Sequence, residues 1–213
     1  MRELRVAAAV ALSAVSGDAI IRASRLEKRY GRKRALPPTD LRVETGAFAV
    51  VTGPNGSGKT TLLRLVAGLA APTRGELDVD VDRARLGFVG HEPLVYRDLT
   101  GLENLDLYGR LYRVPERRER SGMLLERFDL WDARGERAGA YSRGMLQRLA
   151  LCRALLHEPE LLLLDEPFTA LDADGAALLD RQLSDLAGGT SVVLSTHDPA
   201  RVDSLATARV ALA

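Results

Sequence analysis

Apolar runs alternate with helical patterns along the chain from Ala19 onward. Five of these runs predict strands, at residues 19–26 (AIIRASRL), 48–52 (FAVVT), 84–90 (ARLGFVG), 160–165 (ELLLLD) and 190–196 (TSVVLST). Continuous apolar runs such as Leu161–Leu164 are typical of strands that are buried on both faces. The pattern therefore predicts an α/β fold, with a parallel-rich sheet flanked by helices.

The middle of the chain has a different pattern, with helical periodicity and no convincing strand from Pro93 to about residue 140. Thr100 and Glu103 form a capping-box pattern at the start of one helix, which should end near Pro115. We therefore expect a helical subdomain over about residues 93–150. It would interrupt an α/β domain that spans residues 19–213 and follows an N-terminal extension of residues 1–18.

The extension resembles a signal peptide, because Arg2 and Arg5 precede the apolar run Val6–Val15. This run is too short to span a membrane, and no other segment approaches the about 20 apolar residues that a membrane helix needs. A short extension or a misplaced start is the preferred reading, since the chemistry below requires cytosolic nucleotide.

Composition favours a soluble globular protein without a nucleic-acid partner. Of the residues, 46% are hydrophobic, and the formal net charge is +1 with basic residues spread along the chain. The single cysteine, Cys152, lies in an apolar helical pattern, which predicts a core residue and suits a reducing compartment. His91 and His157 are expected to be surface or packing residues, because three scattered histidines cannot form a metal cluster.

A phosphate-binding motif follows the strand predicted at residues 48–52. GPNGSGKTT matches G-x-x-x-x-G-K-[ST], whose backbone N–H groups surround a phosphate at the start of a helix. Lys59 adds a positive charge for the β- and γ-phosphates, and the Thr60 hydroxyl can bind Mg²⁺. The predicted nucleotide-binding residues are Gly53, Pro54, Asn55, Gly56, Ser57, Gly58, Lys59, Thr60 and Thr61.

Two acids end the strand predicted at residues 160–165, in the sequence LLLLDEP. Asp165 is placed to hold the magnesium shell. Glu166 can polarise the attacking water as a general base. Together with the phosphate loop, these acids predict a nucleoside triphosphatase that uses Mg²⁺.

With these motifs the chain resembles the ATP-binding cassette (ABC) family over residues 19–213. Tyr30 stands where the family has an aromatic residue that stacks on adenine, and His197 stands at its switch histidine. YSRGM (141–145) takes the place of the LSGGQ signature, and TALD (169–172) takes that of the D-loop. The resemblance implies a P-loop NTPase core with an inserted helical subdomain, and ATP hydrolysis with Glu166 and His197 as catalytic residues.

The resemblance also implies a head-to-tail pair of ATPase domains. In the family, the signature binds the γ-phosphate of ATP that is held by a second subunit, and the N-terminus of a helix favours such an anion. Ser142 and Gly144 retain the residue types this needs, and Asp172 belongs to the D-loop. The signature departs from the consensus at Tyr141, Arg143 and Met145.

A second departure concerns the glutamine that the family usually has at the start of the helical insert. If Pro93 sets the register, this place falls on Glu92, which would then contact Mg²⁺ together with Thr60 and Asp165.

The implied function is the nucleotide-binding subunit of an ABC transporter, on the cytoplasmic face of the cell membrane with separate integral membrane subunits. GHEPLVYRDLTGLENLDLYGRLYRV, together with the segment from YSRGM to TALD, is most similar to the haem-exporter ATPase of cytochrome c maturation. ABC-2-type exporters of drugs or polysaccharides, and non-transport ABC ATPases of DNA repair or translation, remain alternatives. A P-loop kinase would leave YSRGM, TALD and His197 unexplained.

Overall fold

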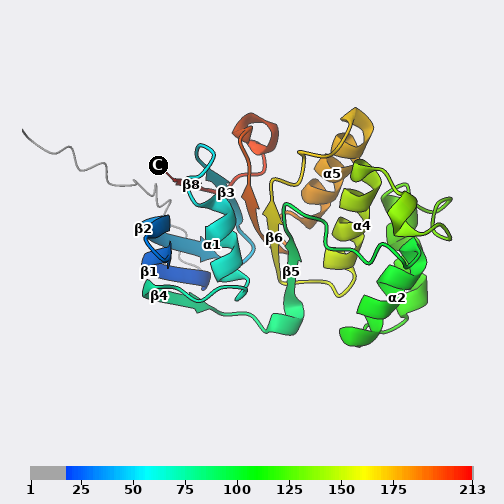
Figure 1. Cartoon of the computed structure of the whole chain (residues 1–213), viewed down its shortest axis with the longest axis horizontal. Coiled ribbons are helices and arrows are strands. Elements are labelled where there is room, and N and C mark those ends of the chain that lie inside the picture. The colour runs from blue at the N-terminus through cyan, green and yellow to red at the C-terminus, as the bar shows by residue number, and fades with distance from the viewer. Residues whose placement is uncertain (1–17, 213) are drawn as a thin grey trace, which may run out of the picture.

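The computed structural model describes residues 18–212, so nearly all of the predicted N-terminal extension, with its resemblance to a signal peptide, lies outside the described residues. The described part is layered (Figure 1): an antiparallel sheet, helix α1 (Lys59–Val66), a parallel sheet, and then helices α4 (Arg143–Leu155) and α5 (Ala173–Leu186). The remaining helices lie beyond α4, at the far end from the antiparallel sheet.

Five parallel strands form the central sheet, which confirms the predicted α/β class. Their order is β5-β6-β7-β3-β8, and every neighbouring pair is parallel. The sequence pattern predicted four of these strands and missed β8, which is short. Their bounds are β3 Phe48–Thr52, β5 Leu86–Val89, β6 Leu161–Asp165, β7 Ser191–Ser195 and β8 Ala208–Ala211.

Both faces of this sheet are buried, which explains its continuous apolar strands. Ala49 and Val51 pack in the cluster that contains α1, whereas Phe48 and Val50 pack in the cluster that contains α4 and α5. All five residues of β6 are buried, and each leucine contributes about 1.5–3 kcal/mol by leaving water. The sheet is therefore a rigid platform for whatever follows the carboxyl ends of its strands.

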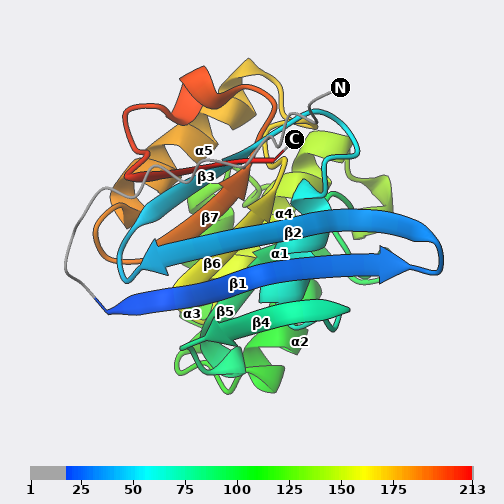
Figure 2. The same ribbon diagram turned by 90° about the vertical axis from the view of Figure 1, so that its left-hand side faces the viewer.

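A three-stranded antiparallel sheet covers the other side of α1 (Figure 2), with β1 (Ala19–Tyr30) between β2 (Lys33–Glu44) and β4 (Arg74–Val79). The sequence reading found only the first part of β1 and did not predict this sheet. Two features hide it: β2 contains Pro37 and Pro38, and β1 has register shifts around Arg25, which has a φ of 46°.

Three further elements form the helical insert ahead of α4: α2 (Gly101–Leu111), α3 (Arg117–Arg127) and a 3₁₀ turn at Ala138–Ala140. Other 3₁₀ turns lie at Arg83–Arg85 and Pro199–Val202. The predicted capping box at the start of α2 is confirmed, because Thr100 and Glu103 accept each other's backbone N–H. Within residues 18–212, no helix has the length and apolar character needed to cross a membrane.

Cys152 packs in the core between α4 and the insert. Its side chain is fully buried, and its Sγ lies 3.5 Å from the carbonyl oxygen of Leu124. Burial raises the pKa of the thiol well above its ordinary value. The structure thus confirms the prediction of a core residue.

Candidate functional site

The loop between β3 and α1 depends on two glycines that have little space around them. A Cβ on Gly53 would lie 2.5 Å from the carbonyl oxygen of Leu212, and one on Gly58 would lie 2.6 Å from that of Ala35. Their φ angles, 148° and 106°, also lie where other residues are strained. Neither glycine can therefore be replaced without moving the loop, and the closely packed loop leads directly into the N-terminus of α1.

An open cavity of about 710 Å³ lies against this loop and the start of α1. Segments far apart in the sequence form its walls: the start of β2, the loop with α1, the segment after β5, and the segments after β6 and β7. A cavity of this size suits a small-molecule ligand. The lining residues are Lys33, Ala35, Asn55, Gly56, Gly58, Lys59, Thr60, Thr61, His91, Glu166, Thr169 and His197.

Lys59 brings a buried positive charge to the cavity. Its side chain is 7% exposed, and its Nζ donates to the carbonyl oxygen of Gly53 at 2.8 Å and lies 3.5 Å from Oε1 of Glu166. A buried ammonium needs such partners, because an unpaired charge is costly away from water. The ammonium is thus held beside the loop whose glycines form the cavity wall.

Glu166 contacts both Lys59 and His197, which follows the neighbouring strand β7. Oε2 of Glu166 lies 2.8 Å from Nδ1 of His197 and accepts the backbone N–H of His197 at 3.3 Å. Glu166 also has a φ of 50°, a left-handed conformation that is strained for a glutamate and typical of functional sites. The structure therefore places both predicted catalytic residues beside Lys59.

Asp165 is buried behind Glu166 and only partly satisfied. Its Oδ1 accepts the Ser195 hydroxyl at 2.7 Å, whereas its Oδ2 is buried without a hydrogen-bond partner. Ser195 also accepts the Glu166 backbone N–H at 3.0 Å. Ser195 thus orients both acids. The sequence analysis missed it, although a polar residue at the end of an apolar strand was an available signal.

The segment after β5 places His91, and not Glu92, in the cavity wall. His91 lines the cavity together with Thr60 and Glu166. Glu92 lines a neighbouring cavity of about 730 Å³, which Glu166, Thr169 and Asp172 share. The sequence reading expected His91 to be a surface or packing residue; it is exposed, and it faces both cavities.

Ser142 and Gly144 lie at the N-terminus of α4, and neither lines the cavity beside Lys59 in the described chain. The Ser142 hydroxyl accepts the backbone N–H of Met145 at 3.2 Å and so caps α4. A Cβ on Gly144 would lie 3.3 Å from the carbonyl oxygen of Ala170. Asp172 caps α5 in the same way, through Gly175. Arg143, which lies between Ser142 and Gly144, lines the 730 Å³ cavity that Glu166 also lines.

Tyr30 lies at the end of β1, with half of its surface exposed and Lys28 Nζ 4.9 Å from its ring centroid. It does not line the 710 Å³ cavity, but it pairs across the hairpin with Lys33, which does. Lys33 and Ala35 were missed by the sequence reading, because they belong to the strand that it did not predict.

Comparisons of the sequence with known proteins agree with these motifs. A family profile described as "ABC transporter" matches residues 36–169. The chain is 42% identical over 201 residues to daunorubicin resistance ATP-binding protein DrrA3 of Streptomyces coeruleorubidus, covering 89% of this chain and 64% of that protein. It is 34% identical to ABC transporter ATP-binding protein NatA of Bacillus subtilis (strain 168), covering 81% of this chain and 75% of that protein. The chain spans about three fifths of the length of the first curated relatives it matches.

Solved structures give the same result. The ATP-binding subunit of an ABC transporter superposes with a TM-score of 0.83 at 27% identity, covering 91% of this chain and 85% of that chain. A dimeric ATP-binding cassette in a post-hydrolysis state, bound to ADP and Pi, superposes with a TM-score of 0.81 at 29% identity, covering 90% and 94%.

Proposed function

This chain belongs to the ABC transporter family, and from that premise we propose that it is the ATP-hydrolysing subunit of an exporter. One observation carries the proposal: a single cavity brings together the phosphate loop, Lys59, Glu166 and His197. Each group has a task in the hydrolysis of a phosphoanhydride, and none requires a covalent intermediate. The structural relative that is bound to ADP and Pi supports the same assignment.

In the proposed reaction, the phosphate loop and Lys59 bind the triphosphate. The Lys59 ammonium exchanges its contacts with Gly53 and Glu166 for the β- and γ-phosphate oxygens. Glu166 is then free to accept a proton from the attacking water as general base. His197, whose Nδ1 lies 2.8 Å from Oε2 of Glu166, holds the base in place beside the γ-phosphate.

The residues present fit a magnesium ion as a partner of the nucleotide. Residues 18–212 contain no cluster of three or more acidic, histidine or cysteine side chains that could hold a metal ion by themselves. Mg²⁺ is usually held by one or two protein oxygens together with phosphate oxygens. Thr60 and the unpartnered Oδ2 of Asp165 supply such oxygens. Glu92 lines the neighbouring cavity, and we propose that it reaches the metal when two copies close on ATP. Once bound, the ion neutralises charge that develops on the phosphates.

Glu92 and its neighbour His91 can be distinguished by a magnesium series. We expect Glu92→Gln to retain activity with a shifted Mg²⁺ dependence, and Glu92→Ala to lower turnover, because only the amide keeps an oxygen ligand. His91→Ala is the matched neighbour, since His91 lines the cavity beside Lys59 and Glu92 does not. Steady-state ATPase rates against Mg²⁺ concentration measure this. If only His91→Ala changes the curve, Glu92 is not a metal ligand.

We propose that ATP joins two copies of this domain head to tail. Ser142 and Gly144 do not line the cavity beside Lys59 in the described chain, and Ser142 is exposed at the N-terminus of α4, where we place the nucleotide of a second copy. The N-terminus of α4 carries no acidic residue in its first turn, and its dipole favours an anion. The dimeric relative bound to ADP and Pi supports this arrangement.

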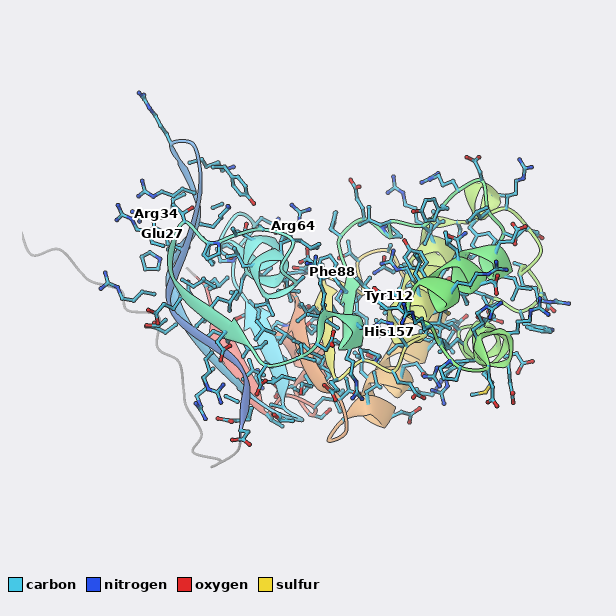
Figure 3. The ribbon with its side chains drawn as sticks, turned by 90° about the horizontal axis from the view of Figure 1, so that it is seen from below. Glu27, Arg34, Arg64, Phe88, Tyr112 and His157 are labelled. Atoms are coloured by element: carbon cyan, nitrogen blue, oxygen red, sulfur yellow. The ribbon has the colours of Figure 1, made fainter. Side chains whose placement is uncertain are left out.

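A groove between the core and the helical insert is the proposed contact for the integral membrane subunit. It is lined by Leu69 and Leu94, which are 55% and 59% exposed, and by Tyr112 and Phe88. Figure 3 shows Phe88, Tyr112 and His157 at the junction of β5 with the helices. Exposed apolar side chains around a groove favour a protein partner. Association through this groove would keep the chain on the cytoplasmic side of the membrane.

Relatives favour drug export over haem export as the transported class. The two relatives that are 42% and 41% identical to the chain are both daunorubicin resistance ATP-binding proteins. Flat polycyclic drugs are therefore the substrate class that we propose. Haem export, the closer resemblance in the sequence analysis, stays a prediction that the names of these relatives do not support.

Reconstitution tests this proposal. The chain, purified from membranes with the integral membrane protein that accompanies it, is placed in proteoliposomes. We expect daunorubicin to raise the ATPase rate severalfold and haemin to leave it unchanged. Stimulation by haemin alone would restore the haem-export assignment, and the absence of any membrane protein among the partners would contradict transport.

A further inference from the structure

Arg153 of α4 is a buried arginine whose contacts all lie outside its own helix. Its side chain is about nine-tenths buried. Nη1 donates to the carbonyl oxygens of Leu94 at 2.6 Å and Pro93 at 3.2 Å, and Nη2 donates to that of Phe88 at 3.0 Å. Among the described residues no carboxylate pairs with it. The positive charge of the guanidinium is therefore stabilised by backbone carbonyl groups of residues 88–94, which run from the end of β5 into the following loop.

The loop that Arg153 contacts has a strained backbone at Leu94, the residue whose carbonyl accepts the shortest of the three hydrogen bonds. Leu94 has a φ of 49°, a left-handed conformation that a leucine rarely adopts. Such a conformation persists only where the surrounding structure enforces it. Glu92 and His91, two and three residues earlier in the same loop, line the cavities around Glu166. The bond to the Leu94 carbonyl thus fixes the chain just after them.

Arg153 also connects this loop to the other elements around the groove. Its guanidinium lies 5.3 Å from the ring centroid of Tyr108 on α2, and it lines the groove together with Leu94. The Leu94 side chain points outward, with 59% of its surface exposed. One side chain therefore joins α4, the insert and the loop that carries His91.

We propose that Arg153 is a positioning residue for ATP hydrolysis, which holds the loop of His91 and Glu92 in register with the phosphate cavity. It touches no reacting atom and acts through the carbonyls of Pro93 and Leu94. Lysine cannot replace it fully, because a single ammonium cannot span three carbonyls as the planar guanidinium does. The inference rests on the proposed function, since turnover is the quantity that the loop position changes.

Arg148, one turn earlier on α4, is the matched control. Its Nη1 donates to the carbonyl oxygens of Phe128 at 2.8 Å and Asp129 at 3.0 Å, and Asp129 is also left-handed, with a φ of 53°. Both arginines therefore donate to the carbonyls of a left-handed turn, but Arg148 also pairs with Oδ2 of Asp129 at 3.2 Å. Arg148 binds a turn of the helical insert, however, whereas Arg153 binds the loop beside the cavity.

The test compares Arg153→Lys and Arg153→Met with Arg148→Lys and Arg148→Met in the full chain. We expect the Arg153 variants to lower kcat by about 10- to 100-fold, with lysine the milder change, while KM for ATP moves less than about threefold. The Arg148 variants should keep kcat at comparable losses of melting temperature. Hydrogen exchange of the peptide that spans residues 88–99 should rise for the Arg153 variants only.

Hydrogen exchange tests the positioning role of Arg153 separately from the proposed ATP hydrolysis. If the wild-type chain shows no turnover, the proposed function fails, and the exchange of residues 88–99 still decides whether Arg153 anchors the loop. Unchanged exchange in Arg153→Lys would overturn the inference, and so would faster exchange with wild-type kcat. Arg153→Lys decides the matter if Arg153→Met does not fold.

Discussion

Glu166→Gln is expected to bind ATP with nearly wild-type affinity and to hydrolyse it about 10³-fold more slowly. The amide keeps the shape of the side chain and its contact with the Lys59 ammonium through the carbonyl oxygen, but it cannot accept the proton of water. Glutamine is as strained as glutamate at a φ of 50°, so the backbone of the site should not change. Phosphate release and a fluorescent-nucleotide titration measure the two effects separately.

The same variant should accumulate as an ATP-bound dimer, because the nucleotide that joins the two copies is no longer consumed. Light scattering with and without ATP measures this association. Glu160→Gln is the control at the other end of β6, where Glu160 forms an exposed ion pair with Arg85; its turnover should be unchanged. A Glu166→Gln rate within a few fold of wild type would remove Glu166 as the general base.

The central sheet could be predicted from the sequence because its strands are buried on both faces. Burial on both faces leaves no alternation to interpret, and β3 was predicted with the bounds that the structure gives it. The antiparallel sheet could not be predicted in the same way. Its strand β2 alternates between buried and exposed positions, but the two consecutive prolines within it favour a loop over a strand.

The residues of the candidate site likewise fall into those that a local sequence pattern reveals and those that it does not. Residues in continuous motifs, such as the loop before α1 and the pair Asp165 and Glu166, could be read directly, because a local motif fixes its own geometry. Lys33 and His91 enter the site only through the order of the strands, and no spacing along the chain encodes that order. In the segment after β5, a shift of one residue distinguishes His91, which lines the cavity beside Lys59, from Glu92, which does not.

Lys59 is the group on which nucleotide affinity should depend most. Its ammonium is 7% exposed and is held at the loop by the Gly53 carbonyl and Glu166. A charge-assisted hydrogen bond contributes about 1.5–3 kcal/mol, and the Lys59 ammonium can make several to the β- and γ-phosphates. The same charge balances Glu166, so its removal also leaves a carboxylate facing an anionic ligand.

Lys59→Ala is therefore expected to weaken ATP binding by about 100-fold or more, since each 1.4 kcal/mol is a factor of ten. Titration with a fluorescent ATP analogue measures the dissociation constant, and the melting temperature without nucleotide shows that the fold is intact. Lys33→Ala is the control, because Lys33 lines the same cavity from the exposed start of β2; its loss should be below about tenfold, as for a solvent-screened charge. Unchanged affinity in Lys59→Ala, with a folded protein, would show that the loop before α1 does not hold the triphosphate.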